Sequence, residues 1–487
     1  MFGKFSRRHF AKLAGLSALA MVARAADAAS QPAADRHAPA SFPKDFVWGT
    51  ATSAYQIEGA VNEDGRGRSI WDTFAHTPGK IEDHTTADRA NDHYHRYKQD
   101  VGLIRELGAK AYRFSIAWPR VFPEGGGAPN PKGLDFYDRL VDELLKNGIE
   151  PFATLYHWDL PQSLEDRVGG WRSSETSKAF GNYAGYVAKR LSDRVKSFFT
   201  INEAGRFVYF GYGSGIDAPG LKLPPAEVNQ VRHHVALAHG LAVQAIRAQG
   251  RAGTNVGPAE NINACVPVFD TSDNVRAAEI ATRELNAGFL GVILDGKYTD
   301  GFLDYAGKDA PKFTDAELKI ISSPNDFVGF NIYSPNFYIA ASDKAPGWSI
   351  LPIPASFPHM NSEWLRIGPE TIYWAPRLAA KVWNIKTIYI SENGTSSEDK
   401  VAADGKIYDL DRIMYLRNYL RQLQRATAEG VPVRGYFLWS LMDNFEWIFG
   451  FEKRFGLYHV DFETQARTAK LSAAFYRDVV ARNAIGV

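Results

Sequence analysis

The feature that most constrains the fold of this chain is a series of eight short apolar runs separated by longer helical patterns. Each run has four to six residues, which suits a buried strand and is too short for a helix. Strands alternating with helices imply parallel pairing, and eight strands imply a closed (β/α)8 barrel, an α/β fold. The runs are Phe46 to Gly49, Ala111 to Ile116, Pro151 to Tyr156, Ser197 to Ile201, Asn255 to Ala259, Phe327 to Ile332, Thr387 to Ile390 and Gly435 to Leu438.

The helical patterns between the runs support one barrel domain over residues 42–487. Apolar residues recur every three or four positions from Leu134 to Leu145, and Gly148 follows as a helix stop. A second helix of this kind spans Leu416 to Leu423. The longer interval from Asn261 to Asn325 and the Pro-rich stretch from Ala345 to Pro358 are expected to be loop insertions at the C-terminal face of the barrel.

Polar or aromatic residues follow seven of the eight runs. The seventh run, for example, continues as Ser391-Glu392-Asn393-Gly394, which places a carboxylate at a strand end. Any one of these residues alone is more often structural. Together they predict a site, because all strand C-termini of a parallel barrel open on the same face. The other residues are Gln56, Arg113, His157, Asn202, Glu203, Asn331, Tyr333, Trp439, Glu446 and Trp447.

Composition narrows the ligand and the chemistry. The formal net charge is +1, which provides no basic field for nucleic acid. The 11 Trp, 22 Tyr and 30 Phe residues provide flat faces suited to sugar rings and apolar ligands. Cys265 is the single cysteine, which excludes an internal disulfide and a cysteine-based metal cluster.

Histidine and glutamate could instead serve a metal. His93 and His95 are two positions apart and would face different ways on a helix, and the first run ends without paired histidines. His233, His234 and His239 fall in a predicted helix, where structural histidines are common. We therefore expect no metal and no cofactor.

The amino-terminal segment resembles a twin-arginine export signal. Arg7 and Arg8 lie within Ser6 to Lys12 and precede an apolar run, Leu13 to Val22, that is too short to span a bilayer. Small-x-small cleavage sites follow near residue 28. We expect a signal peptide over residues 1–28, a disordered lead-in over residues 29–41, and a periplasmic or secreted protein without a stable membrane span, exported by the twin-arginine machinery.

The two carboxylates at strand ends, Glu203 and Glu392, point to cleavage of a glycosidic bond. That reaction needs an anion beneath the anomeric carbon and a proton for the departing oxygen. An inward Arg113 would hold a nearby carboxylate ionised, and burial among aromatic residues would raise the pKa of the other. Asn202 would donate to a sugar hydroxyl beside the reacting carbon.

Several motifs, which occur along the chain in the order typical of one family, make a resemblance specific. The chain resembles glycoside hydrolase family 1, the β-glucosidase family, from Phe42 to about Val480. Phe46 to Gly59 resembles the opening pattern of the family, and Tyr112 to Arg120 its second-strand pattern. Thr200 to Ala204 resembles the acid/base motif T-F-N-E-P, and Ile390 to Gly394 the nucleophile motif I-T-E-N-G. Further matches are His157 to Pro161 and Trp439 to Trp447.

The resemblance implies a retaining exo-acting β-glucosidase that releases terminal non-reducing β-D-glucosyl residues through a covalent glycosyl-enzyme. Glu392 would be the nucleophile and Glu203 the acid/base, with carboxyl groups roughly 5 to 5.5 Å apart. Tyr333 would orient the nucleophile. Retention of Glu446 implies a neutral glycone, because related branches that bind phosphorylated sugars replace this acid. The implied sugar-binding residues are Gln56, His157, Asn202, Asn331, Tyr333, Trp439, Glu446 and Trp447.

The chain departs from the family pattern beside the acid/base. Ala204 replaces the usual proline and Ile201 the usual phenylalanine, and loss of proline would loosen the aim of Glu203. Two alternatives stay open at this stage, a transglycosylating β-glycosidase and a non-catalytic exported sugar-binding protein. The sequence leaves open the preference among glucose, galactose and fucose, the aglycone and the oligomeric state.

Overall fold

A computed structural model describes residues 41–486, which form one compact unit. The signal peptide expected over residues 1–28 and the lead-in, apart from Ser41, lie outside these described residues. Within the described part of the chain, no helix is both long enough and apolar enough to cross a bilayer.

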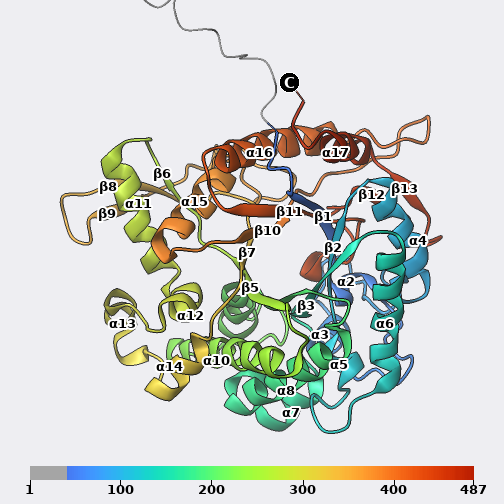
Figure 1. Cartoon of the computed structure of the whole chain (residues 1–487), viewed down its shortest axis with the longest axis horizontal. Coiled ribbons are helices and arrows are strands. Elements are labelled where there is room, and N and C mark those ends of the chain that lie inside the picture. The colour runs from blue at the N-terminus through green and yellow to red at the C-terminus, as the bar shows by residue number, and fades with distance from the viewer. Residues whose placement is uncertain (1–40, 487) are drawn as a thin grey trace, which may run out of the picture. The chain divides into compact units, whose positions relative to one another are not determined.

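Eight parallel strands close into a barrel in the order β1-β11-β10-β7-β5-β4-β3-β2 (Figure 1). All eight predicted runs are strands of this barrel, which confirms the expected (β/α)8 fold. The bounds are β1 Val47–Ala51, β2 Ala111–Ser115, β3 Glu150–Tyr156, β4 Ser197–Asn202, β5 Asn255–Asn261, β7 Val328–Asn331, β10 Ile388–Asn393 and β11 Val433–Trp439.

Helices surround the barrel on its outer side (Figure 1). Those that link successive barrel strands or follow the last are α4 His93–Glu106, α6 Pro131–Lys146, α8 Ser174–Leu191, α10 Pro225–Gln249, α15 Thr371–Trp383, α16 Leu410–Ala428 and α17 Leu471–Arg482. The remaining helices are α2 Ala54–Ile57, α3 Ile70–Ala75, α5 Trp118–Val121, α7 Gln162–Val168, α9 Ala204–Phe207, α11 Ser272–Leu285, α12 Val292–Asp295, α13 Asp300–Ala306 and α14 Asp315–Ile321.

The helix α6 shows how the periodic pattern works. It begins at Pro131, whose ring fixes a helical φ, and Gly148 follows its end with a φ of 68°. Leu134, Leu140 and their neighbours on one face are buried against the barrel. Leu145, which the pattern placed on that face, is 41% exposed. The buried stripe of α6 is therefore narrower than predicted.

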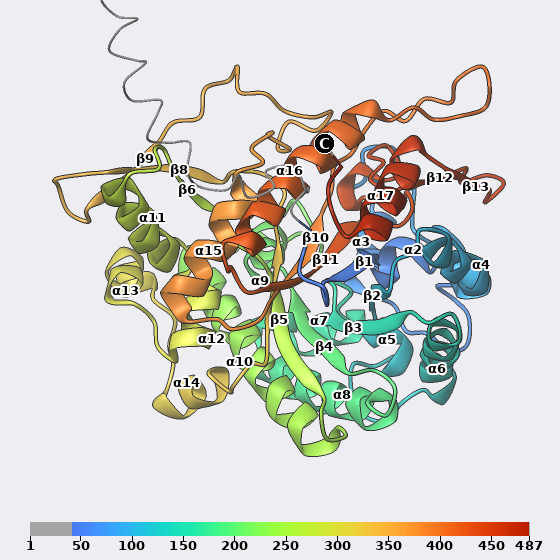
Figure 2. The same cartoon turned by 45° about the horizontal axis from the view of Figure 1, so that its top comes forward.

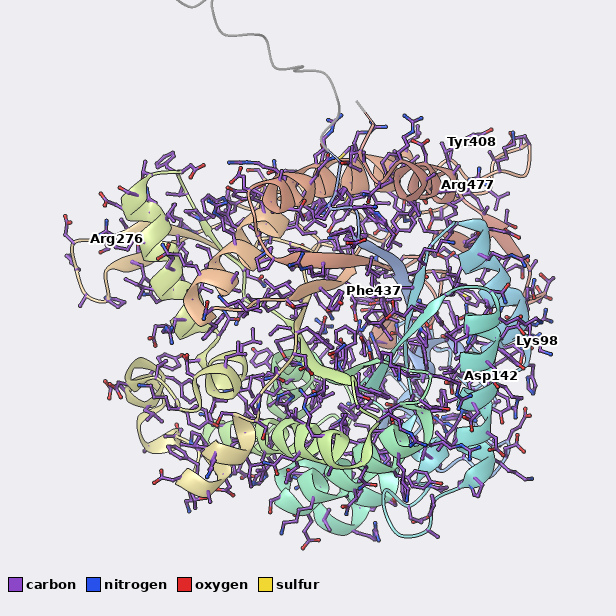
Figure 3. The ribbon with its side chains drawn as sticks, in the orientation of Figure 1. Lys98, Asp142, Arg276, Tyr408, Phe437 and Arg477 are labelled. Carbon is purple, nitrogen blue, oxygen red and sulfur yellow. The ribbon has the colours of Figure 1, made fainter. Side chains whose placement is uncertain are left out.

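Aromatic side chains fill the barrel interior. Phe437 packs against Phe152 with ring centroids 4.9 Å apart, and Tyr389 packs against Phe152 at 5.5 Å. Phe437 lies near the centre of the ribbon, whereas charged residues such as Lys98 lie at its edge (Figure 3). The large rings need small neighbours, since a Cβ on Gly49 would lie 2.6 Å from Phe437. This packed interior forms the floor on which the site rests.

The expected loop insertions are more ordered than predicted. The interval 261–325 contains α11 to α14, and the interval 345–358 contains a strand. Strands β6 Cys265–Pro267, β8 Phe337–Ala341 and β9 Trp348–Leu351 form a small sheet beside α11 (Figure 2). A hairpin of β12 Tyr458–Val460 and β13 Arg467–Ala469 completes the strands. The sequence analysis did not predict these strands, because they are short and β6 pairs with the distant strand β8.

Candidate active site

Glu392 lies at the end of β10 with its side chain buried in the barrel mouth. Arg113 on β2 donates from Nη1 to Oε1 at 2.6 Å, and the Tyr333 hydroxyl donates to Oε2 at 2.7 Å. The pairing of β10 with β7 shifts register between Ile390 and Glu392. Such a bulge re-aims a side chain at the strand end. The carboxylate is therefore held at both oxygens.

Glu203 directly follows β4 and is also buried. Its backbone is left-handed, with a φ of 50°, and it precedes the short helix α9. Asn331 donates to its Oε1 at 2.7 Å, and Asn261 donates to the same oxygen at 3.3 Å. Trp158 and Trp447, at the same mouth, also have positive φ values. Strained backbone of this kind clusters at functional sites.

A chain of hydrogen bonds connects the two carboxylates. Arg113 donates to Glu392 and, from Nη2, to Oδ1 of Asn202 at 2.6 Å. Asn331 donates to that same Oδ1 at 3.1 Å and to Glu203. Arg113 on β2, Asn202 on β4 and Asn331 on β7 therefore fix the position of Glu392 relative to Glu203.

The ionisation of Glu392 differs from the expectation for an arginine-paired carboxylate. Burial raises the pKa of Glu392 to about 7, although Arg113 and the Tyr333 hydroxyl lower it and Glu203 raises it. Desolvation therefore outweighs Arg113. Burial also raises the pKa of Tyr333 well above its usual value, so its hydroxyl stays protonated and remains a donor.

Aromatic and imidazole rings form one wall of the barrel mouth. His157 stacks on Trp439 at 5.7 Å and on Trp447 at 6.0 Å. Asn202 Nδ2 lies 3.3 Å from His157 Nε2. Burial, with a smaller effect of Arg113, lowers the pKa of His157 well below its usual value, so the ring is neutral. Burial raises the pKa of Glu446, beside this wall, to about 8.

Gln56, predicted to bind an outer sugar hydroxyl, contacts the loop that carries Glu446. Its Nε2 donates to the backbone oxygen of Phe445 at 2.8 Å and to Asn444 at 3.0 Å, and its Oε1 accepts from Ser53 at 2.6 Å. Nε2 also lies 3.5 Å from Oε2 of Glu446. These hydrogen bonds fix Gln56 against the loop that carries Glu446, and its contact with a sugar stays a prediction.

The other predicted residues meet at one cavity of about 1250 Å³. Both carboxylates line it, and Arg113 lies buried next to it. The predicted residues that line it are His157, Asn202, Glu203, Asn331, Tyr333, Glu392, Trp439, Glu446 and Trp447.

Several cavity residues were missed by the sequence analysis. Strand β5 extends to Asn261, beyond the predicted end at Ala259, so this strand also ends on polar residues. Glu260 and Asn261 both line the cavity, and their position directly after an apolar run was the available signal. Arg206 lies 3.9 Å from Glu203 and also lines the cavity, but no motif marked it.

The histidines considered for a metal have structural partners. His93 pairs with Asp100 at 2.8 Å in the core, whereas His95 is exposed beside Asp92 and Glu63. His239 contacts Thr200 at 2.8 Å. None of these imidazoles belongs to the cavity.

Comparisons with known proteins find a family and similar chains. The family profile described as glycosyl hydrolase family 1 matches residues 38–485. The chain is 44% identical over 449 residues to beta-glucosidase A of Acetivibrio thermocellus, covering 91% of this chain and 99% of the relative. It is 43% identical over 461 residues to a bifunctional beta-D-glucosidase/beta-D-fucosidase of Bifidobacterium breve, covering 90% and 98%.

Solved structures are similar as well. A structure of beta-glucosidase from Thermotoga maritima in complex with glucoimidazole superposes with a TM-score of 0.83 at 39% identity, covering 91% of this chain and 99% of that one.

Proposed function

The chain belongs to glycosyl hydrolase family 1, and from that premise we propose how its cavity carries out the activity of a retaining β-glucosidase. The observation that carries the proposal is the pair of buried carboxylates, Glu203 and Glu392, joined through Arg113, Asn202 and Asn331 at one cavity. A pure sugar-binding protein needs neither acid, and the relatives are named as enzymes.

Glu392 is the proposed nucleophile. Its carboxylate attacks the anomeric carbon as the bond to the departing oxygen breaks, and Glu203 gives that oxygen its proton. The glycosyl group is then bonded to Glu392. In the second step Glu203 takes a proton from water, whose oxygen attacks the anomeric carbon and frees Glu392. Two inversions leave the product in the β configuration. The carboxyl separation of roughly 5 to 5.5 Å stays a prediction.

These two steps require that Glu203 carries a proton and that Glu392 is ionised before the substrate reacts. Both oxygens of Glu392 accept hydrogen bonds from Arg113 and Tyr333, so a proton on either oxygen would face a donor. Asn331 and Asn261 both donate to Oε1 of Glu203, and Arg206 lies 3.9 Å from its Oε2. The donors at both oxygens of Glu392 therefore favour its ionised form.

The walls of the cavity suit a neutral glycone. Asn202 donates to Nε2 of His157 at 3.3 Å, so the neutral imidazole carries its proton on Nδ1. Trp439 offers a flat face. A phosphorylated sugar would be repelled by the Glu392 carboxylate in the ionised form that reacts.

The outer cavity favours an apolar aglycone. Large apolar side chains that line its rim are exposed to solvent. Exposed apolar patches of this kind often mark a binding surface. A rim of this kind would bind aryl or alkyl groups through burial of apolar surface. The rim residues are Tyr209, Ile280, Tyr305, Ile350 and Trp364.

We infer export by the twin-arginine route from Arg7 and Arg8 and the apolar run that follows them. The family match begins at residue 38, after this segment. Replacement of both arginines by lysine would retain the chain in the cytoplasm if the inference is right, and undiminished export would contradict it.

Removal of the nucleophile tests the proposed function directly. Glu392→Ala should abolish hydrolysis of 4-nitrophenyl β-glucoside, because no anion remains to form the covalent intermediate. Added azide should restore turnover and yield α-glucosyl azide, since it enters the space of the lost carboxylate. A variant that keeps its activity without azide would refute the assignment.

A further inference from the structure

The start of helix α9 lacks the usual side-chain cap. Glu203 occupies the position before the helix, where a residue normally accepts a hydrogen bond from a backbone N–H of the first turn. Its carboxylate instead accepts from Asn331 in the cavity and makes no such bond. The first N–H groups of α9 therefore need another acceptor, because buried N–H groups are costly to leave unpaired.

Glu260 on the adjacent strand β5 supplies that acceptor. Its Oε2 accepts from the backbone N–H of Ala204 at 2.8 Å, and its Oε1 accepts from that of Gly205 at 3.0 Å. The Glu260 side chain is only 4% exposed. The N–H of Glu203 itself donates to the backbone oxygen of Ala259 at 2.8 Å. Three consecutive N–H groups are thus tied to two consecutive residues of β5.

The side chains around this contact fit the carboxylate closely. A Cβ on Gly205 would lie 3.0 Å from Oε1 of Glu260, so glycine is what allows the carboxylate to reach that N–H. The hydrogen bond from Ala204 also depends on the residue type, since proline, which the family motif has at this position, carries no N–H to donate. The Ala204-Gly205 pair and Glu260 therefore form one matched arrangement.

We propose that Glu260 is a positioning residue that aims Glu203 at the departing oxygen, replacing with two backbone hydrogen bonds the rigidity that proline confers elsewhere in the family. The inference rests on the proposed role of Glu203 as the acid/base. Proline restricts its own φ and the conformation of the residue before it. Glu260 fixes the same residues from outside, which keeps Glu203 in its left-handed backbone conformation.

The test compares two substrates with the same glycone in Glu260→Leu, which removes both acceptors. Methyl β-glucoside needs a proton on its departing oxygen, whereas 2,4-dinitrophenyl β-glucoside departs without one. A misaimed acid should lower kcat/KM for the methyl glucoside about 10- to 100-fold, as expected for a displacement of order 1 Å. For the dinitrophenyl glucoside the loss should stay under about 3-fold.

A second variant separates positioning from general damage to the fold. Ala204→Pro removes the N–H that Glu260 serves, so in the Glu260→Leu background it should recover part of the lost activity on methyl glucoside. Glu260→Gln, which retains one good acceptor, should lose less than Glu260→Leu. The matched control is Glu317→Leu, since Glu317 accepts a backbone N–H of Thr314 at the start of α14, away from the cavity.

Three outcomes overturn the proposal: equal losses on both substrates in Glu260→Leu, no recovery in the double variant, or the same substrate dependence in Glu317→Leu. If the unaltered protein hydrolyses neither glucoside, the proposed function itself fails, and that result is distinct from these three. Should Glu260→Leu not fold, Gly205→Ala, which pushes the carboxylate away, replaces it in the same comparison.

Discussion

The hydroxyl of Tyr333 should control the pH at which Glu392 becomes a competent nucleophile. The hydroxyl donates to Oε2 of Glu392 at 2.7 Å and stays protonated because burial raises the pKa of Tyr333. Tyr333→Phe removes this donor with little change in packing. A hydrogen bond to a charged group contributes about 1.5–3 kcal/mol, so the pKa of Glu392 should rise by roughly one to two pH units.

The sign of the effect on activity follows from the state that reacts. Glu392 attacks only when ionised, so activity appears as pH rises through its pKa, which is about 7 in the unaltered protein. Loss of a hydrogen-bond donor disfavours the ionised form of Glu392 and moves the acid limb of the pH–rate curve to higher pH. Below the limb, kcat/KM should fall roughly 10- to 100-fold relative to the unaltered protein, because the ionised fraction of Glu392 drops about 10-fold for each pH unit by which its pKa rises. The pH–rate curve should therefore narrow from its acid side.

The assay is kcat/KM for 4-nitrophenyl β-glucoside measured from acidic to alkaline pH in both proteins. Tyr94→Phe is the matched control, because the Tyr94 hydroxyl donates to Asp64 outside the cavity. The control should keep the pH dependence of the unaltered protein. An acid limb that stays in place in Tyr333→Phe, or moves to lower pH, would refute the argument that this hydroxyl stabilises the ionised nucleophile.

Three further predictions concern the acid/base, the buried ion pair and the rim. Glu203→Gln should lower kcat/KM about 10²- to 10⁴-fold for methyl β-glucoside and far less for 2,4-dinitrophenyl β-glucoside, and equal losses would contradict the acid role. Arg113→Met leaves Glu392 buried without its partner and should lower the free energy of unfolding by about 3–5 kcal/mol at alkaline pH. The deficit should shrink toward pH 5 as Glu392 takes up a proton in the folded state, and a deficit measured by urea unfolding that does not change with pH would oppose this reasoning. Among alkyl β-glucosides, whose departing oxygens are similar, kcat/KM should rise about 4-fold for each methylene buried at the rim, and Trp364→Ala should flatten the trend; no dependence on chain length would exclude an apolar rim site.

Local patterns carried most of the fold prediction. Runs of four to six apolar residues with turn residues after them located all eight barrel strands to within a few residues. The strands inside the insertions were not predicted, because β6, β8 and β9 are short and β6 forms only by pairing with the distant β8. The end of β5 was missed because its last two residues, Glu260 and Asn261, are polar and end the apolar pattern.

What the sequence by itself determined is the set of polar residues at the mouth, since side chains that follow parallel barrel strands must open on one face. Only the tertiary structure decided how those residues are used. Arg113 serves Glu392 from 279 positions away, Gln56 supports the loop of Glu446, and Glu260 holds the turn of Glu203. These pairings depend on strand register and on distances of a few ångströms between chain segments. The pKa of Glu392 depends on burial, and no order of residues along a chain encodes that burial locally.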